Sequence, residues 1–295
     1  MTGALWATIS GIGFGFFQAF NRRAGQAFDA YFSTFVLIAI SALILAGASV
    51  LTEDLGRLNG LPLMTYVNFA LAGLIHFFLG WTLLTVSQNK IGAARTGALS
   101  GTSPLFALFI SALAFNEFLR APVLGGILML VAGVYLVSFD KNPLAGASGK
   151  QWLDSMYGLG VAVCFSISPI FIRGGLEILN SPLLGVTIGM SFSALAYGIT
   201  LFFRRSHLLQ GVLTSDAIIY QLAASVFVGF STWTRWVALD EAPVSVVLAL
   251  GRLNVPVVIL LSPILVGSAQ ENVTLRVWIG AILIVSGSLI LNFYG

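Results

Sequence analysis

The sequence is poor in charge, and this scarcity decides its class. Charged residues make up 8% of the 295 residues and apolar residues 58%, with a mean hydropathy of +0.97. A soluble domain carries about 25% charged residues, so a chain with so few cannot coat a water-soluble surface of this size. The net charge of +3 comes from scattered lysines and arginines without a basic stripe. We therefore expect a lipid bilayer as the surroundings and no nucleic-acid partner.

The sequence also lacks the residue patterns of common catalytic and metal sites. Its single cysteine, Cys164, excludes an internal disulfide and a thiolate metal site. It contains no His-x-x-Glu-His motif, no phosphate-binding glycine loop with lysine, and no Gly-x-Ser-x-Gly. We expect no catalytic residues, no metal, no cofactor and no enzymatic activity.

The sequence instead contains long apolar runs. A membrane-spanning helix needs about 20 mostly apolar residues, and polar breaks divide the chain into ten such segments. They lie near 2–20, 30–50, 62–85, 92–115, 120–138, 154–174, 181–202, 215–238, 243–265 and 273–293. The first has no basic residue before it, and Arg22 and Arg23 follow it, so we interpret it as a retained span rather than a signal peptide. Every acidic residue lies at a predicted span end or in a loop.

The two halves of the chain resemble each other. Trp81-Thr82 recurs as Trp233-Thr234, an offset of 152 residues (233 − 81 = 152), which also places Pro104 on Pro256. An offset of 154 places Glu117 on Glu271, Gly126 on Gly280 and Gly133 on Gly287. These matches predict a duplication, with a first five-helix repeat at 1–140, a linker at 141–153 and a second repeat at 154–295. Because five is odd, the second repeat enters the membrane inverted, as in many secondary transporters.

Lysines and arginines favour one orientation of this arrangement. Loops after odd-numbered spans hold eight of them and loops on the opposite face hold four. The face with more basic residues is normally cytoplasmic. We therefore expect both termini outside the cytoplasm of a bacterial inner (plasma) membrane.

In each half a proline is followed by a glutamate and then by two glycines. This pattern, which occurs twice, resembles the pattern of the drug/metabolite transporter superfamily, and of its ten-helix EamA-type branch in particular. The resemblance covers the whole chain, and within that branch it is greatest to the YddG-type exporters of aromatic amino acids. It implies a central cavity lined by spans 1, 3, 4, 6, 8 and 9, with spans 5 and 10 at the periphery.

Two ionisable residues fall in the middle of predicted spans, His76 in the third and Arg252 in the ninth. Such residues normally face a cavity or a bundle interior and mark a pathway. Arg252 suits a substrate carboxylate, through a charge-assisted pair. The alternative for Arg252 is a structural pairing with backbone carbonyls that Pro104 or Pro256 frees. The alternative for His76 is that its uncharged ring only packs against neighbouring residues.

Further candidates for the site are small, polar or aromatic. Arg252, His76, Gln18, Phe14, Ser100, Ser103 and Asn254 form the predicted substrate site, and Pro104, Pro169 and Pro256 the predicted kinks. The serines lie on a small polar stripe of span 4, which either lines the cavity or packs closely against another helix. Trp233 and Trp236, near a span end beside Arg235, suggest an interfacial aromatic belt.

The sequence thus predicts an all-α integral membrane protein with ten helices in two inverted repeats around a central cavity. We expect it to export small amphipathic metabolites, in particular aromatic or other apolar amino acids, by alternating access. A transporter of another metabolite class, a lipid-acting membrane enzyme and a passive channel remain as alternatives. A buried carboxylate, which an organic-cation antiporter needs, is missing from the predicted spans.

Overall fold

The structure, a computed structural model, describes residues 3–24, 29–91, 96, 99–104, 106–107, 110, 121–138, 150–204, 214–266 and 275–294. These residues form helices and turns and include no strand. Seven helical stretches within them are long and apolar enough to cross a membrane, judged by length and composition. The described part of the chain is therefore all-helical, in agreement with the expected multi-pass membrane protein.

The helices follow the predicted spans closely. In chain order they are α1 (Gly3–Ala24), α2 (Ala30–Thr52), η1 (Leu55–Leu58), α3 (Leu63–Gly73), η2 (Leu74–Gly80), α4 (Trp81–Ile91), α7 (Ala121–Ser138), α8 (Lys150–Leu179), α9 (Pro182–Arg204), α10 (Ser215–Glu241), α11 (Val244–Leu250), η3 (Gly251–Leu253), α12 (Asn254–Val266) and α13 (Leu275–Tyr294). Nine of the ten predicted spans coincide with these elements. The span predicted at 92–115 lies largely outside the described residues.

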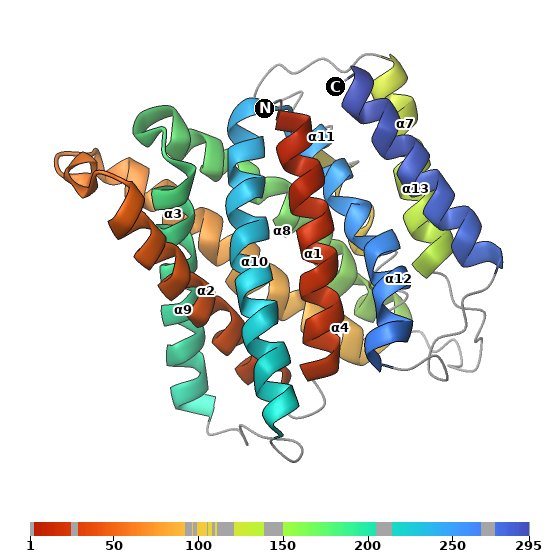
Figure 1. The fold of residues 1–295 in the computed structure, drawn as a ribbon, viewed down its shortest axis with the longest axis horizontal. Helices are drawn as coiled ribbons and strands as arrows, with labels where there is room; N and C mark the ends of the chain where they lie inside the picture. The colour runs from red at the N-terminus through yellow and green to blue at the C-terminus, as the bar shows by residue number, and fades with distance from the viewer. Residues whose placement is uncertain are drawn as a thin grey trace.

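The helices form one bundle in which α1 and α10 run side by side near the middle (Figure 1). Helices α2, α3 and α9 lie on one side of this pair, and α12 lies on the other. Helices α7 and α13 pack on each other at the far edge. The two chain ends lie at the same end of the bundle, here called the terminus end.

Glycines set the closest helix contacts. A Cβ added to Gly133 on α7 would lie 2.6 Å from the carbonyl oxygen of Gly280 on α13, and one added to Gly287 would lie 2.6 Å from that of Gly126. The contact is therefore reciprocal. It joins the same four glycines that the offset of 154 residues relates in the sequence, with the partners exchanged.

The outer faces of the bundle are apolar. Leu43, Leu195 and Phe203 are 72%, 61% and 77% exposed, respectively. Contiguous apolar surface of this kind mostly marks contact with a membrane or a partner. Here it is continuous with helices long enough to span a bilayer, so these side chains contact lipid.

Two boundaries differ from the expectation. Helix α8 begins at Lys150, so the last four residues of the linker predicted at 141–153 are helical. Residues 141–149 lie outside the described part of the chain. The predicted third span is not one regular α-helix, because the π-helical segment η2 interrupts it at Leu74–Gly80.

Candidate functional site

Arg252 lies where the predicted ninth span is broken. The 3₁₀ segment η3 separates α11 from α12 there, before Pro256 rather than at it. The Arg252 Nη2 donates to the carbonyl oxygen of Ser100 at 2.6 Å and to the Oγ of Ser103. The side chain therefore bridges the second half of the chain to the first.

Pro104 explains one of these contacts. A proline inside a helix removes the hydrogen bond to the carbonyl four residues earlier, which here is that of Ser100. Arg252 donates to this carbonyl, so the structural pairing suggested by the sequence does occur. The guanidinium is only partly used by the described residues, since the buried Arg252 Nε finds no hydrogen-bond partner among them. The buried Asn254 Oδ1 nearby in the sequence has none either.

The first half carries a matching break. Gly101 and Thr102 form a turn between helical residues at 99–100 and 103–104. The Thr102 hydroxyl and backbone N–H both bond the Leu99 carbonyl, at 2.6 and 3.1 Å. An offset of 152 residues places the Gly101-Thr102 turn on residues 253–254, so it overlaps the last residue of η3. The two irregular segments thus lie at adjoining positions in the two halves.

Helix α1 lies directly against the break in the second half. A Cβ on Gly11 would lie 2.6 Å from the Leu250 carbonyl oxygen, and one on Gly15 would lie 2.5 Å from the Cβ of Val257. Because these glycines are four residues apart, they share one face of the helix. Their missing side chains let the α1 backbone approach η3 and α12.

His76 lies in the π-helical segment η2 and is buried, with 6% of its surface exposed. Its Nδ1 lies 2.9 Å from the Ser168 Oγ on α8, and its ring stacks on Phe165 with centroids 4.4 Å apart. Single π-helical turns often occur at functional sites. Packing and hydrogen bonding both hold this imidazole, so it has more than a packing role.

Arg235 is the residue that the sequence analysis missed. Its Nη1 lies 3.4 Å from the Nε2 of His76, although it stands only six residues before the end of α10. Helical side chains point toward the helix N-terminus, so this guanidinium extends into the bundle rather than out to the near end. Its neighbour Trp236 is 2% exposed and packs against Phe69. The predicted interfacial position is therefore wrong for Trp236.

Two serines of α8 contact the residues around the two arginines, one serine for each. Ser166 on α8 donates to the Ser103 carbonyl oxygen at 2.8 Å, and Ser168, two residues further, contacts His76. Arg252 bonds Ser103, and His76 contacts Arg235. Pro169 follows Ser168 inside α8, which continues through it as a helix. The structure thus brings Arg252, His76 and both predicted serines into one polar cluster.

The predicted aromatic candidates reach this cluster through ring contacts. Phe14 packs edge-on against Phe17, which stacks on Trp81 with centroids 5.7 Å apart. Trp81 in turn contacts Phe77, and Phe77 contacts His76. Gln18, also a predicted site residue, is exposed.

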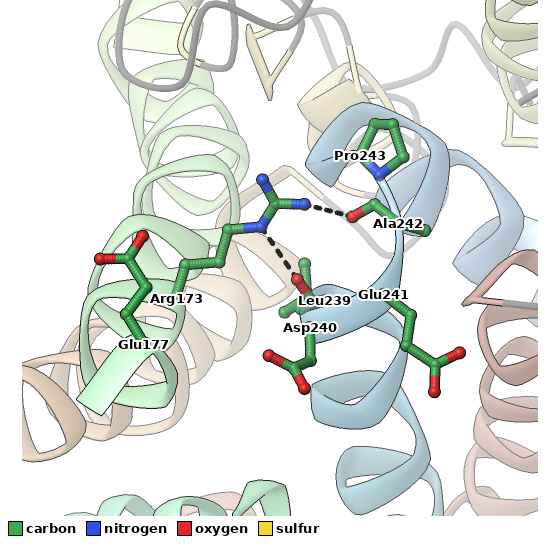
Figure 2. Close-up of a pocket in the computed structure, with 7 residues that line it drawn as sticks. All are labelled: Arg173, Glu177, Leu239, Asp240, Glu241, Ala242 and Pro243. Atoms are coloured by element: carbon green, nitrogen blue, oxygen red, sulfur yellow. Dashed lines mark hydrogen bonds between the residues drawn. The ribbon is translucent and has the colours of Figure 1, made fainter. Parts of the chain in front are cut away.

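A pocket of about 330 Å³ opens at the terminus end between α8 and α10. Figure 2 shows Arg173 reaching from α8 to the end of α10, where it donates to the carbonyls of Leu239, at 2.9 Å, and Ala242. Carboxylates of Glu177, Asp240 and Glu241 surround the pocket. Cationic groups stabilise the free carbonyls at helix C-termini, so Arg173 fastens α8 to the α10–α11 turn.

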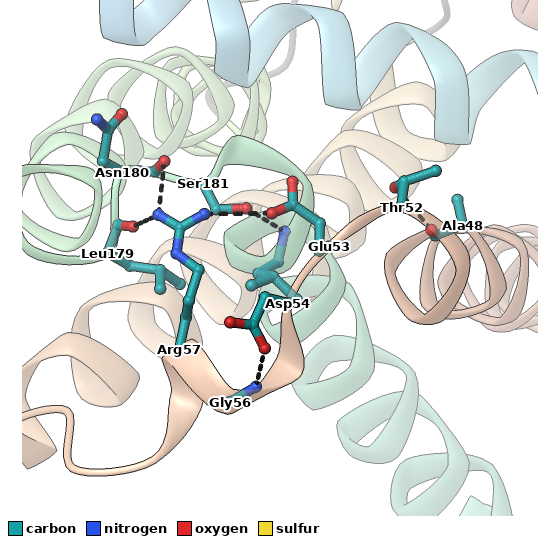
Figure 3. A network of polar contacts seen from close by, with 10 residues as sticks. Ala48, Thr52, Glu53, Asp54, Gly56, Arg57, Leu179, Asn180 and Ser181 are labelled. Atoms are coloured by element: carbon teal, nitrogen blue, oxygen red, sulfur yellow. Dashed lines mark hydrogen bonds and ion pairs between the residues drawn. The ribbon is translucent and has the colours of Figure 1, made fainter.

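A second arginine closes the same end between the two halves. Arg57 follows α2 and donates to the carbonyls of Leu179 and Asn180 in the α8–α9 turn, at 2.6 and 3.2 Å (Figure 3). Glu53 accepts from the same guanidinium at 3.3 Å. This contact ties the first half to the second at the terminus end.

The opposite end also has a contact between the halves. Lys90 on α4 forms an ion pair with Asp154 on α8, with the Nζ 2.9 Å from Oδ1. The hydrogen bond and the charge of Asp154 raise the pKa of Lys90. Contacts at both ends therefore hold the halves together, and the polar cluster lies between them.

Comparison with known proteins identifies the first half. Residues 1–139 match the EamA-like transporter family. This match agrees with the resemblance to the drug/metabolite transporter superfamily for that part of the chain. It includes α1, His76, Ser100 and Ser103, so most of the first-half cluster lies in the EamA-like region.

Two further comparisons cover different lengths. A solved crystal structure of a protein superposes with a TM-score of 0.71 over 97% of this chain and 96% of its own, at 18% identity. The fold is therefore shared over nearly the whole chain. An undecaprenyl-diphosphatase of Rhodopirellula baltica is 31% identical over 107 residues, which are 36% of this chain and 40% of that protein.

Proposed function

We propose that the protein is a secondary transporter that exports small amphipathic metabolites carrying a carboxylate, in particular amino acids with aromatic or other apolar side chains. The substrate binds at the cluster around Arg252, between the two halves. Phe14, Gln18, His76, Ser100, Ser103 and Asn254 complete the proposed site. The EamA-like match of the first half supports transport of a small molecule.

The paired helix breaks carry this proposal. In transporters with internal repeats, interrupted helices at corresponding positions of the two halves mark the substrate site near the bilayer midplane. Here the turn at Gly101-Thr102 falls, at the offset of 152, on residues 253–254 at the end of the 3₁₀ segment η3, and this nearness supports the proposal. Irregular backbone at membrane depth is tolerated where it is buried or lines a cavity.

The reciprocal packing of α7 and α13 supports an inverted repeat. A two-fold relation requires that each contact recur with the partners exchanged. Gly133 meets Gly280 and Ile284, and Gly287 meets the corresponding residues Gly126 and Leu130. Both chain ends lie at one end of the bundle (Figure 1), as an even number of crossings requires.

Alternating access would proceed by rocking one half against the other around the fixed site. The Arg57 contact joins the halves at the terminus end and the Lys90–Asp154 pair joins them at the other. Opening toward one side would break one of these contacts and keep the other.

Substitution of Arg252 tests the site. Arg252→Lys keeps the charge but loses the planar fork, so we expect uptake of labelled phenylalanine into proteoliposomes to fall at least about tenfold, as loss of a charge-assisted hydrogen bond predicts. The melting temperature of this variant should stay near that of the parent. Arg276→Lys, at the start of the edge helix α13, is the matched control for expression and reconstitution.

The Arg252→Ala variant distinguishes a substrate-binding role of Arg252 from a purely structural role. A purely structural role predicts poor expression or a low melting temperature, because the Ser100 carbonyl loses its donor. A well-folded Arg252→Ala protein that transports amino acids normally would rule out the carboxylate clamp.

A membrane-embedded enzyme acting on a lipid is the second candidate, favoured by the segment similar to an undecaprenyl-diphosphatase. Such an enzyme needs acids, bases or a metal gathered near an interface. The part of the chain that the structure describes has no group of three or more His, Cys, Asp or Glu side chains placed to hold a metal ion. Release of phosphate from undecaprenyl diphosphate by the purified protein would favour this candidate over the transporter.

A further inference from the structure

A groove of about 620 Å³ lies between α2 and α9 on the outer face of the bundle. The two helices cross on one side of the bundle (Figure 1), and all of the described residues that line the groove are apolar except Ser191. Small residues such as Ala39, Ala42 and Gly198 form its floor, and large exposed ones such as Leu195 form its walls. The short side chains leave the space that the long ones border.

The groove runs along about half the thickness of a bilayer. Its lining residues extend from Ser191 to Phe203 on α9 and from Phe35 to Ala46 on α2. At a rise of 1.5 Å per residue the α9 stretch is about 18 Å long, and one leaflet of the hydrocarbon core is about 15 Å thick. Helix α9 ends at Arg204, directly after Phe203. The groove therefore runs from the middle of α9 to its end, opposite the terminus end.

The width of the groove suits a hydrocarbon chain and not a helix. A volume of 620 Å³ over about 18 Å gives a cross-section of about 34 Å², or a width of about 6–7 Å. An α-helix with its side chains is about 10–12 Å across, so a helix of a second copy or of another membrane protein does not fit inside. A single acyl chain does fit, because its carbon atoms pack about 4 Å from their neighbours.

Shape and charge decide which molecule binds there. The hydrophobic effect contributes little, because a chain that leaves the surrounding lipid for the groove exchanges one apolar medium for another. The groove reaches the membrane surface next to a cationic residue, Arg204. Basic residues at this depth attract anionic lipid head groups, and this is the end of the bundle that we expect to face the cytoplasm.

We propose that the groove binds one acyl chain of an anionic phospholipid, whose phosphate lies beside Arg204 at the end of α9. The offset of 152 residues places both ends of α2, Ala30 and Thr52, on those of α9. The bound chain therefore contacts equivalent helices of the two halves. Toward the terminus end the same helices meet directly, through the hydroxyls of Ser49 and Thr187 at 3.2 Å. The lipid fills the space that they leave open at the other end.

Native mass spectrometry of the purified full-length protein tests the head group. The probes are phosphatidylglycerol, which is anionic, and phosphatidylcholine, which is zwitterionic, both with oleoyl chains. We expect phosphatidylglycerol to bind about fivefold more tightly, as one basic residue near the surface predicts. Arg204→Gln should remove this difference. Arg276→Gln, which removes a charge from the start of the edge helix α13, should leave it unchanged.

Filling the groove tests where the chain binds. Ala39→Phe places a phenyl ring in the path of the chain, so both lipids should bind at least about tenfold more weakly through the loss of about ten atom contacts. Val50→Phe, at a 64% exposed position of α2 outside the groove, is the matched control. Leu195→Ala shortens a wall without adding volume, so it tests the groove even if Ala39→Phe does not fold. It should weaken both lipids about threefold.

Three results would overturn the proposal. Equal binding of the two lipids, or a preference that survives Arg204→Gln, would remove the role of charge. Unchanged binding in Ala39→Phe and Leu195→Ala would place the lipid elsewhere. A dimer of the protein that Ala39→Phe dissociates would make a second copy the occupant. None of these measurements uses a transported substrate, so each of these results would leave the proposed function standing.

Discussion

At the scale of single residues, His76 connects the two ends of the polar cluster. Its Nε2 faces a guanidinium, which can only donate, so the imidazole accepts there and carries its proton on Nδ1 toward Ser168. A second proton would place a cation against Arg235. The structure therefore gives His76 a positioning role for Arg235, and no carboxylate contacts it among the described residues.

His76→Gln tests whether His76 drives transport by titrating. A glutamine amide offers an acceptor to Arg235 and a donor to Ser168, so we expect a loss of less than about 1 kcal/mol in binding, or about fivefold in affinity. The pH profile of uptake should keep its shape. A strong pH dependence that disappears in His76→Gln would instead show proton coupling through this residue.

His76→Leu is the matched variant without hydrogen bonds. It leaves Arg235 and Ser168 without their partner, so we expect the unfolding free energy to fall by about 1–3 kcal/mol. Thermal denaturation in detergent measures this loss. A leucine variant as stable as the glutamine variant would contradict the positioning role.

At the scale of elements, irregular helices build the site and glycines hold the helices together. The π-helical segment η2 carries His76, and the 3₁₀ segment η3 carries Arg252. Gly11 and Gly15 bring α1 against the second of these breaks. The regular helices α7 and α13, in contrast, pack mainly on each other at the edge of the bundle, through their reciprocal glycine contact.

Alanine substitutions test the reciprocal contact between α7 and α13. Because the backbone atoms opposite Gly133 and Gly287 are equally close, Gly133→Ala and Gly287→Ala should each reduce stability by about 1–3 kcal/mol, as overpacking does. Gly125 on α7 has no atom within 4 Å of an added Cβ. Gly125→Ala should therefore be neutral or stabilising by up to about 1 kcal/mol. Equal melting temperatures for all three variants would refute the close contact.

At the scale of the whole molecule, the two ends of the bundle differ in charge. The described residues at the terminus end include the acidic Glu53, Asp54, Glu177, Asp240 and Glu241. Lys90 at the end of α4 and Lys150 at the start of α8 lie toward the opposite end, and the first arginines of the chain, Arg22 and Arg23, lie in the last turn of α1 there. This asymmetry is the one that normally sets orientation in the membrane.

Reporter fusions test the orientation. With more basic residues at the end opposite the chain termini, we expect both termini outside the cytoplasm. A C-terminal alkaline phosphatase fusion should be active, and a C-terminal fluorescent protein that matures only in the cytoplasm should stay dark. Bright fluorescence would place the C-terminus inside and reverse the predicted orientation.

The sequence by itself determined the class of the protein, the limits of most helices and the two ionisable residues His76 and Arg252. Apolar runs and isolated charges are local properties, so composition and spacing are enough to find them. The sequence also pointed to the broken ninth span, because Pro256 cannot continue a regular hydrogen-bond ladder.

Only the tertiary structure decided which groups meet. Arg235 looked like a residue at a span end, and the direction of its side chain along α10 brings it to His76. The partner of Arg252 turned out to be the Ser100 carbonyl, 152 residues away in the chain. Such contacts depend on how distant helices cross, and on side-chain directions that no local pattern of residues specifies.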